Sequence, residues 1–306
     1  MNTSSVKMEE FWSVKFYPYT KPGVDPIYAV VGGKHILICR PPTEDNGVEV
    51  LRYIIDEEPS ADHYTCCWTK DLATKTPLLP CVAGVDAKIK IFDVLSGKLL
   101  RVLVGHGGEI NELKTSPINP HILASCSKDS TIRIWSLDPK DEDFPCAAML
   151  TGGHKDAVIT IDFHHSGRYL LSGGWTLPKF PDENTGTKLA TQIQYPHFAS
   201  SDIHTDAVDC VRFYDDSILS RGANENSPTQ HEAANASSTL TCFTDPSKFD
   251  TYARIIEFSA PETETFWMRF SLFQGLPHPP HPPTNLHQPL PPLNPNLTPS
   301  PPPTSP

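Results

Sequence analysis

Basic residues are scarce in this sequence. Its 306 residues include 25 Lys and Arg against 36 Asp and Glu, which gives a formal net charge of −11. A protein that binds nucleic acid through its phosphate groups needs a positively charged surface. We therefore expect no direct contact with nucleic acid. An acidic surface suits a basic partner instead, such as a protein tail rich in Lys and Arg.

Long apolar runs and paired cysteine motifs are also missing. No apolar run is long enough to span a bilayer, and the first ten residues, MNTSSVKMEE, lack the apolar segment of a secretory signal. The eight cysteines form no C-x-x-C pair, so neither a metal site nor a redox motif is indicated. We expect reduced, mostly buried thiols in an intracellular protein, with no metal ion, no cofactor and no membrane association.

The most informative stretch runs from residue 105 to residue 135. It opens with Gly105-His106, continues as alternating apolar and polar residues, turns at 117–120 and again at 128–130, and ends in Trp135. Alternation with a period of two between turn signals predicts short antiparallel strands. A Gly-His opening followed about one blade length later by Trp is typical of a WD40 repeat, which is one four-stranded blade of a β-propeller.

Four polar residues of this stretch are expected to form a buried hydrogen-bonded chain, which in WD40 blades fixes the turn and the twist. They are His106, Ser125, Asp129 and Trp135. Buried polar groups need partners, and an indole N–H needs an acceptor. A Ser, a His and an Asp could also form a hydrolase triad, but the sequence has no G-x-S-x-G elbow and the repeat explains every member. We interpret the four residues as structural and the protein as non-catalytic.

The same pattern recurs on both sides of this stretch. Alternating strands in 11–55 and 64–104 predict two blades before it. Gly153-His154 opens another blade after it, and we expect His154 to serve the same structural network as His106. The sequence therefore predicts an all-β protein built from WD40 blades.

Two segments and both ends interrupt this pattern. Polar sequence replaces the expected third strand of a blade at 175–192 and at 227–262. Proline is so frequent in 274–306 that this segment can neither form ladder hydrogen bonds nor bury a core. We expect a mobile N-terminus at 1–10, an irregular propeller over 11–273 and a disordered proline-rich tail.

Several runs resemble one particular family of WD40 proteins. These are DPIYAVVG (25–32), YTCCWT (64–69), GHGGEINELK (105–114), SKDSTIRIW (127–135), GGHKDAVITIDF (152–163), YPHFASSDIHTDAVDCVRF (195–213) and FWMRFSLF (266–273). Together they resemble the EED and extra sex combs family, the WD40 subunits of Polycomb repressive complex 2.

The resemblance implies a seven-bladed propeller in the nucleus, with a scaffold role in gene repression. Proteins of this family bind trimethyl-lysine on histone tails, notably at lysine 27 of histone H3. They also hold the histone methyltransferase subunit and have no catalytic activity of their own. The resemblance thus implies two partners, a methylated histone H3 tail and the other subunits of the repressive complex.

An aromatic cage is the binding site that the resemblance implies. Carried over by motif, its members are Phe16, Tyr64, Phe266 and Trp267. A trimethylammonium group donates no hydrogen bond, so it is bound by the negative faces of several rings, each contributing about 0.5–2 kcal/mol. Any one of these rings alone would be interpreted as core packing, and only their joint presence in matched motifs favours a cage.

The propeller is expected to be incomplete. Seven blades of roughly 40–45 residues need close to 300 residues of regular sequence, and the chain offers fewer before its proline-rich tail. We therefore expect a truncated or mis-spliced form of the family. Open blade edges would make the isolated chain unstable.

Two other interpretations remain at this stage. The chain could be a generic WD40 interaction scaffold with no affinity for methyl-lysine. It could also be an enzyme that uses His63, His164 and His165 as metal ligands, although neither their spacing nor a cysteine partner supports this.

Overall fold

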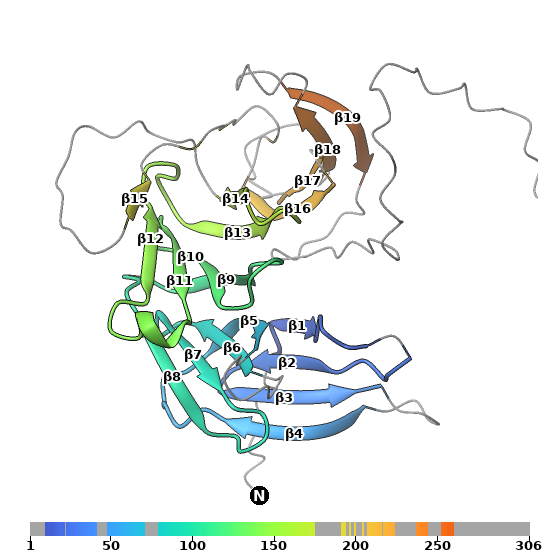
Figure 1. The fold of residues 1–306 in the computed structure, drawn as a ribbon. Coiled ribbons are helices and arrows are strands. Elements are labelled where there is room, and N and C mark those ends of the chain that lie inside the picture. Colours follow the sequence, from blue (N-terminus) through green and yellow to red (C-terminus); the bar gives the residue numbers. More distant parts are fainter. Residues whose placement is uncertain are drawn as a thin grey trace, which may run out of the picture. The chain divides into compact units, whose positions relative to one another are not determined.

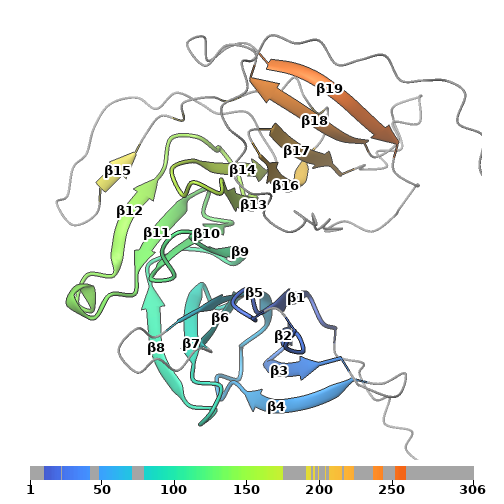
Figure 2. The same cartoon turned by 45° about the vertical axis from the view of Figure 1, so that its right-hand side comes forward.

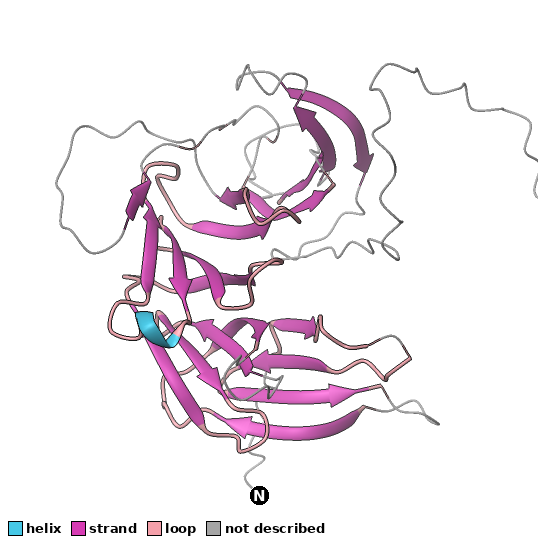
Figure 3. Cartoon of the chain, in the orientation of Figure 1, coloured by secondary structure: helices cyan, strands magenta, loops and turns pink. Residues whose placement is uncertain are grey.

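The computed structural model describes residues 10–21, 23–41, 48–70, 79–174, 191–193, 196, 199, 204, 207–215, 217–223, 237–243 and 252–259. Apart from the short 3-10 helix η1 (Pro139–Asp141), the described elements are strands (Figure 3). Within these ranges, no helix has the length and the apolar composition needed to cross a membrane.

The strands form five sheets, which we number as blades 1 to 5 in chain order (Figure 1). Blade 1 consists of β1 (Ser13–Phe16), β2 (Tyr28–Gly32), β3 (His35–Arg40) and β4 (Glu49–Ile55). Blade 2 consists of β5 (His63–Thr69), β6 (Leu79–Gly84), β7 (Lys88–Phe92) and β8 (Leu99–Val104). Both are antiparallel in sequence order, which confirms the strands expected in 11–55 and 64–104.

The other three blades are also built from antiparallel strands, with one parallel strand added in blade 3 and two described strands in blade 4 (Figure 2). Blade 3 consists of β9 (Ile110–Thr115), β10 (Ile122–Ser127), β11 (Ile132–Ser136) and β12 (Cys146–Leu150), with β15 (Thr191–Ile193) parallel to β12. Blade 4 contains β13 (Val158–Phe163) and β14 (Leu170–Gly174). Blade 5 consists of β16 (Val208–Tyr214), β17 (Ser217–Gly222), β18 (Ser237–Phe243) and β19 (Tyr252–Ser259). The all-β WD40 architecture predicted from the sequence is therefore confirmed.

One expectation about blade 5 is wrong. Polar sequence at 227–262 was expected to replace its third strand, but β18 and β19 both lie in this segment and pair antiparallel with each other and with β17. The strand pattern is weak in the sequence, because β18 is rich in Ser and Thr and the alternation in β19 is broken by two adjacent isoleucines, Ile255 and Ile256. The other irregular segment, up to residue 190, and the tail at 274–306 lie outside the described residues.

The first strand of each blade contacts the first strand of the next. The pairs are β1 with β5, β5 with β9, β9 with β13, and β13 with β16. The backbone N–H of Leu113 donates to Oγ1 of Thr65 over 3.2 Å, and that of Val211 donates to Oγ1 of Thr160 over 3.3 Å. These contacts join equivalent positions, so the five inner strands run in the same direction. We call the face on which they all begin the top face.

A buried carboxylate adds to this contact between inner strands. Glu112 on β9 is 1% exposed. It accepts hydrogen bonds from the hydroxyl of Thr160 over 2.8 Å and from the backbone N–H of Ile161 over 2.9 Å. Its other oxygen lies 3.1 Å from a guanidinium nitrogen of Arg212 on β16. One side chain thus connects blades 3, 4 and 5, and all its oxygens have partners, as a buried charge requires.

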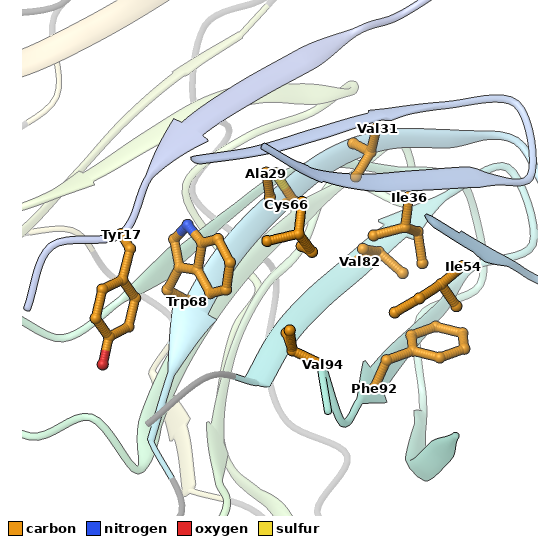
Figure 4. Packing of buried hydrophobic residues seen from close by; sticks show 11 residues of the cluster. Tyr17, Ala29, Val31, Ile36, Ile54, Cys66, Trp68, Val82, Phe92 and Val94 are labelled. Atoms are coloured by element: carbon orange, nitrogen blue, oxygen red, sulfur yellow. The ribbon is translucent and has the colours of Figure 1, made fainter. Parts of the chain in front are cut away.

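Apolar side chains fill the space between neighbouring blades. The cluster between blades 1 and 2 includes Trp68 of β5 and Phe92 of β7, which face aliphatic residues of β2, β3 and β4 (Figure 4). The indole N–H of Trp68 donates to the carbonyl of Lys15 over 2.8 Å, so the ring is both buried and satisfied. Equivalent clusters lie between blades 2 and 3 and between blades 3 and 4.

The polar chain predicted for blade 3 is present in the structure. Nδ1 of His106 lies 2.9 Å from Oδ2 of Asp129, and Nε2 lies 2.7 Å from Oγ of Ser125. The same Oγ accepts the indole N–H of Trp135 over 2.8 Å. A neutral imidazole satisfies all these contacts, and burial lowers the pKa of His106 in agreement with this.

Shorter versions of this chain occur in blades 4 and 5. Nε2 of His154 lies 2.8 Å from Oγ of Ser172, and Nε2 of His204 lies 2.7 Å from Oγ of Ser220. Burial lowers the pKa of His154 to about 4. The histidine that opens each of these blades is therefore bound to a serine of the second strand.

Replacing Ser125 with alanine should destabilise the fold. The substitution leaves the indole N–H of Trp135 and a nitrogen of His106 buried without a partner, which costs about 1–3 kcal/mol of the free energy of unfolding. Thermal unfolding of the two proteins measures this. Ser60→Ala removes an exposed hydrogen bond to Glu58 and should change stability by less than about 0.5 kcal/mol. Equal melting temperatures for Ser125→Ala and wild type would contradict the role assigned to the chain.

The low pKa of His154 makes stability depend on pH. Between its ordinary pKa of 6.5 and about 4, the unfolded chain binds a proton that the folded chain does not. Stability is therefore fully present above pH 6.5 and is lost as the pH falls towards 4, by at most about 3 kcal/mol. Melting temperatures across this range should fall less steeply for His154→Gln than for wild type. Parallel curves would show that His154 does not contribute.

Candidate functional site

Two aromatic side chains meet on the top face between blades 1 and 2. Trp12 immediately precedes β1, and Tyr64 is the second residue of β5. Their ring centroids lie 5.8 Å apart with an angle of 75° between the planes, an edge-to-face contact. Trp12 is 45% exposed, so a large part of the indole remains open to a ligand. We call Trp12 and Tyr64 the aromatic pair.

Phe16 does not lie beside Tyr64. It is the last residue of β1 and is 61% exposed, and its ring packs on Tyr28 at a centroid distance of 5.4 Å. Because the inner strands run in parallel, the end of β1 lies away from the start of β5. The structure therefore brings Trp12, and not Phe16, beside Tyr64.

The strand period explains why the sequence does not separate Phe16 from Trp12 as the neighbour of Tyr64. Trp12 and Phe16 are four residues apart, so both side chains are on the same face of an extended chain, and the alternation alone does not separate them. Four residues of a strand nevertheless span about 13 Å. The position of Tyr64 at the start of its own strand was the available signal, because in a parallel neighbour the residue beside it must also lie near the start of the strand.

The other two cage residues expected from the sequence, Phe266 and Trp267, lie outside the described residues. The aromatic geometry described at this rim is therefore that of the aromatic pair.

Two acidic side chains lie near Tyr64. Asp62 immediately precedes β5, and Glu109 immediately precedes β9. Burial, followed by the negative charges of Glu109 and Asp62, raises the pKa of Tyr64. The phenol is therefore neutral at physiological pH, and the local field favours a cation over an anion. This environment suits an ammonium group placed against the two rings.

A buried ion cluster holds the segment that leads into Tyr64. Nζ of Lys90 lies 2.6 Å from Oδ2 of Asp56 and 2.7 Å from Oδ2 of Asp86, and Nε2 of His63 lies 3.1 Å from Asp56. All four side chains are at most 6% exposed. Although burial disfavours its charge, the hydrogen bonds from His63 and Lys90 hold the pKa of Asp56 well below its usual range.

This cluster also fixes the loop in front of β5. The backbone N–H of Asp56 donates to the carbonyl of Lys34, and that of His63 donates to the carbonyl of Gly33. Oδ1 of Asp62 accepts the N–H of Gly33 over 3.1 Å. The loop is thus tied to the β2–β3 turn of blade 1, and the start of β5 is held in place. A preorganised ring position costs a ligand less ordering entropy on binding.

The histidines considered as metal ligands have other partners. His63 faces Asp56, and Nδ1 of His164 lies 2.7 Å from Oγ of Ser166. The rings of His164 and His165 contact each other with centroids 4.0 Å apart. In the part of the chain that the structure describes, no group of three or more His, Cys, Asp or Glu side chains is arranged to hold a metal ion.

A family model identifies WD repeats in two segments of the chain. The WD domain, G-beta repeat family model matches residues 97–136 and 145–176. These ranges cover most of blade 3, with its complete polar chain, and the two described strands of blade 4.

Two curated relatives carry Polycomb names. The chain is 47% identical over 234 residues to the Polycomb protein EED of Chaetomium thermophilum, an alignment that covers 72% of this chain and 41% of the relative. It is 32% identical over 217 residues to the Polycomb protein esc of Drosophila melanogaster, covering 64% of this chain and 50% of the relative. The chain therefore spans about half the length of these relatives.

A solved structure has the same fold. In the structure of the Chaetomium thermophilum complex ctPRC2 with H3K27me3 and H3K27M, one chain superimposes with a TM-score of 0.74 at 37% identity. The match covers 88% of this chain and 63% of that chain. At this identity the likeness extends beyond a shared propeller architecture.

Lys90→Met should be strongly destabilising. The change leaves the carboxylates of Asp56 and Asp86 buried without their cation, which costs about 3–5 kcal/mol of the free energy of unfolding. Lys88→Met on the same strand is the matched control, because Nζ of Lys88 is 3.9 Å from Glu58 and its side chain is 39% exposed. Denaturant unfolding of both variants checks this. Similar midpoints for the two variants would contradict the role of the cluster.

Proposed function

Because the chain belongs to the EED and extra sex combs family of Polycomb WD40 proteins, we propose that it is a non-catalytic chromatin reader and scaffold. It binds trimethyl-lysine of the K27 type on the histone H3 tail through the aromatic pair. It supports the histone methyltransferase subunit of a Polycomb repressive complex in gene repression, and it acts in the nucleus. Phe266 and Trp267 complete the cage in this proposal.

The contact of Trp12 with Tyr64 is the observation that supports this function most directly. The two rings come from neighbouring blades and meet at one face, with the indole partly open. A trimethylammonium group binds to the faces of such rings through cation–π attraction, which strengthens when the site is partly desolvated. The carboxylates beside the pair add a favourable field for the cation.

The relatives support the same partners. The structure that superimposes on this chain is a Polycomb repressive complex 2 with H3K27me3, so a protein of this fold occurs together with that ligand. The acidic net charge of −11 suits a basic histone tail. Chromatin regulation by Polycomb relatives supports a nuclear location for this chain.

Substitutions of Trp12 and Phe16, at the two ends of the first strand segment, provide the test. In calorimetric titrations, wild type should bind a histone H3 peptide with trimethyl-lysine 27 at least about tenfold more tightly than its unmethylated counterpart. Trp12→Ala should weaken binding of the trimethylated peptide by about 2- to 30-fold, the range expected for one ring of a cage. Phe16→Ala is the control, because Phe16 is also an exposed aromatic residue and lies only four residues further along the chain, at the other end of β1.

The outcomes separate the proposed function from a generic scaffold. A loss with Phe16→Ala and none with Trp12→Ala would restore the assignment made from the sequence. Tight binding that ignores methylation would indicate a generic WD40 scaffold. Melting curves recorded for each variant show that the folds are intact.

A further inference from the structure

We propose that Glu109 sets the methylation-state preference of this site, by accepting a hydrogen bond from lysines that retain an N–H. The site would then bind dimethyl- and monomethyl-lysine as well as trimethyl-lysine. The inference rests on the proposed function and concerns the same site. It identifies the carboxylate that makes the difference between these ligands.

The fold brings Glu109 to the same rim as the aromatic pair. Trp12, Asp62 and Glu109 each occupy the position immediately before an inner strand, namely β1, β5 and β9. These strands are held in register: Sγ of Cys66 contacts Oγ of Ser13 over 3.8 Å, and Leu113 donates to Thr65. Cys66 is the fourth residue of β5 and Ser13 the first of β1, so Trp12 lies about level with Tyr64. Leu113 is the fourth residue of β9 and Thr65 the third of β5, so Glu109 lies about level with Asp62, at the top-face end of the strand next to Tyr64.

Of the two carboxylates, Glu109 is the one available to a ligand. Asp62 already accepts the backbone N–H of Gly33 over 3.1 Å. The Glu109 side chain is 34% exposed, and its described side-chain contact is an ion pair in which Oε1 lies 3.4 Å from Nζ of Lys128. The backbone carbonyl of Glu109 accepts the N–H of Lys128 over 2.9 Å, which fixes the position from which the side chain extends.

The ion pair with Lys128 can be exchanged. The Lys128 side chain is 62% exposed, and exposed pairs of this kind contribute little to stability because water screens them. An ammonium group from a ligand can therefore replace Lys128 at small cost. In the free protein Lys128 partly neutralises Glu109, so it competes with the ligand.

The chemistry of the ligand decides what Glu109 contributes. Dimethyl- and monomethyl-ammonium groups have one and two N–H donors, and a carboxylate accepts them in short charge-assisted hydrogen bonds. Trimethylammonium has none, so it gains only the longer-range attraction of the charge. The negative charge of Glu109 acts on Tyr64: burial raises the pKa of this phenol most, and Glu109 raises it further. A carboxylate at the edge of an aromatic cage therefore reduces the difference in affinity between the trimethylated ligand and the ligands with fewer methyl groups.

The alternative is that Glu109 and Lys128 only stabilise the top-face turn. In that case the two side chains are equivalent halves of one ion pair, and removing either one should have the same effect on ligand binding. If Glu109 instead binds the ligand and Lys128 competes, the two substitutions should act in opposite directions. This difference in sign is what the experiment measures.

The experiment titrates four histone H3 peptides, with unmodified, monomethyl-, dimethyl- and trimethyl-lysine 27, into wild type, Glu109→Gln and Lys128→Gln. Glu109→Gln should weaken dimethyl-lysine binding by about fivefold or more and trimethyl-lysine binding by about twofold or less. Lys128→Gln should strengthen binding of all methylated peptides by about two- to fivefold. Glu58→Gln, which removes the partner of Lys88, is the control carboxylate and should change neither.

Two results would overturn the inference in distinguishable ways. In the first case, wild type distinguishes trimethylated from unmodified peptide, but Glu109→Gln leaves the ratio of dimethyl to trimethyl affinities unchanged, or both variants change affinity in the same direction. Glu109 then has no role in specificity, and the proposed function stands. If wild type does not distinguish any methylated peptide from the unmodified one, the proposed function and the inference both fail.

Discussion

Sideways hydrogen bonding between the inner strands is the constraint on which the rest of the structure depends. The inner strands β5, β9 and β13 each offer a side-chain oxygen to a backbone N–H of the next inner strand, namely Thr65 to Leu113, Glu112 to Ile161 and Thr160 to Val211. These bonds join equivalent positions, so strands that lie about 50 residues apart begin at the same level. The residue before each strand is thereby brought to a common rim. A ligand site can form there from single residues of several blades, which no local segment could provide.

Buried charged groups fix the register between blades, which apolar packing alone would not determine. Glu112 finds its partners on blades 4 and 5 only in one register of these blades. Lys90 on β7 finds its carboxylate partner only if the loop carrying Asp56 lies beside it. Burying such groups costs free energy, and they contribute specificity in return, because any slipped register would leave a charge without a partner. The aromatic pair lies above this framework. Its ring positions are therefore set by the fold before a ligand arrives.

The sequence predicted contacts correctly where the residues involved lie at fixed spacings within one repeat. The chain from His106 to Trp135 was predictable because the WD40 repeat fixes all four positions within one blade. The sequence alone did not predict contacts that span blades. Trp12 and Phe16 share a strand face, and only the parallel register of β1 and β5 selects Trp12 as the neighbour of Tyr64. The same holds for Lys90, which alternation alone cannot separate from the half-exposed Lys88, although its cation is buried against Asp56. The strands β18 and β19 were missed because the alternation is short in the Ser- and Thr-rich β18 and is broken by Ile255-Ile256 in β19.

The central claim is that the indole of Trp12 forms a wall of a methyl-lysine site. Fluorine NMR of the protein labelled with 5-fluorotryptophan tests it most directly, because the chain has five tryptophans and a Trp12→Phe sample assigns the resonance. On addition of the histone H3 peptide with trimethyl-lysine 27, the Trp12 signal should shift, while that of the buried Trp135 should stay in place. The unmethylated peptide should leave the Trp12 signal unchanged. Binding of the trimethylated peptide with no change at Trp12 would contradict the account.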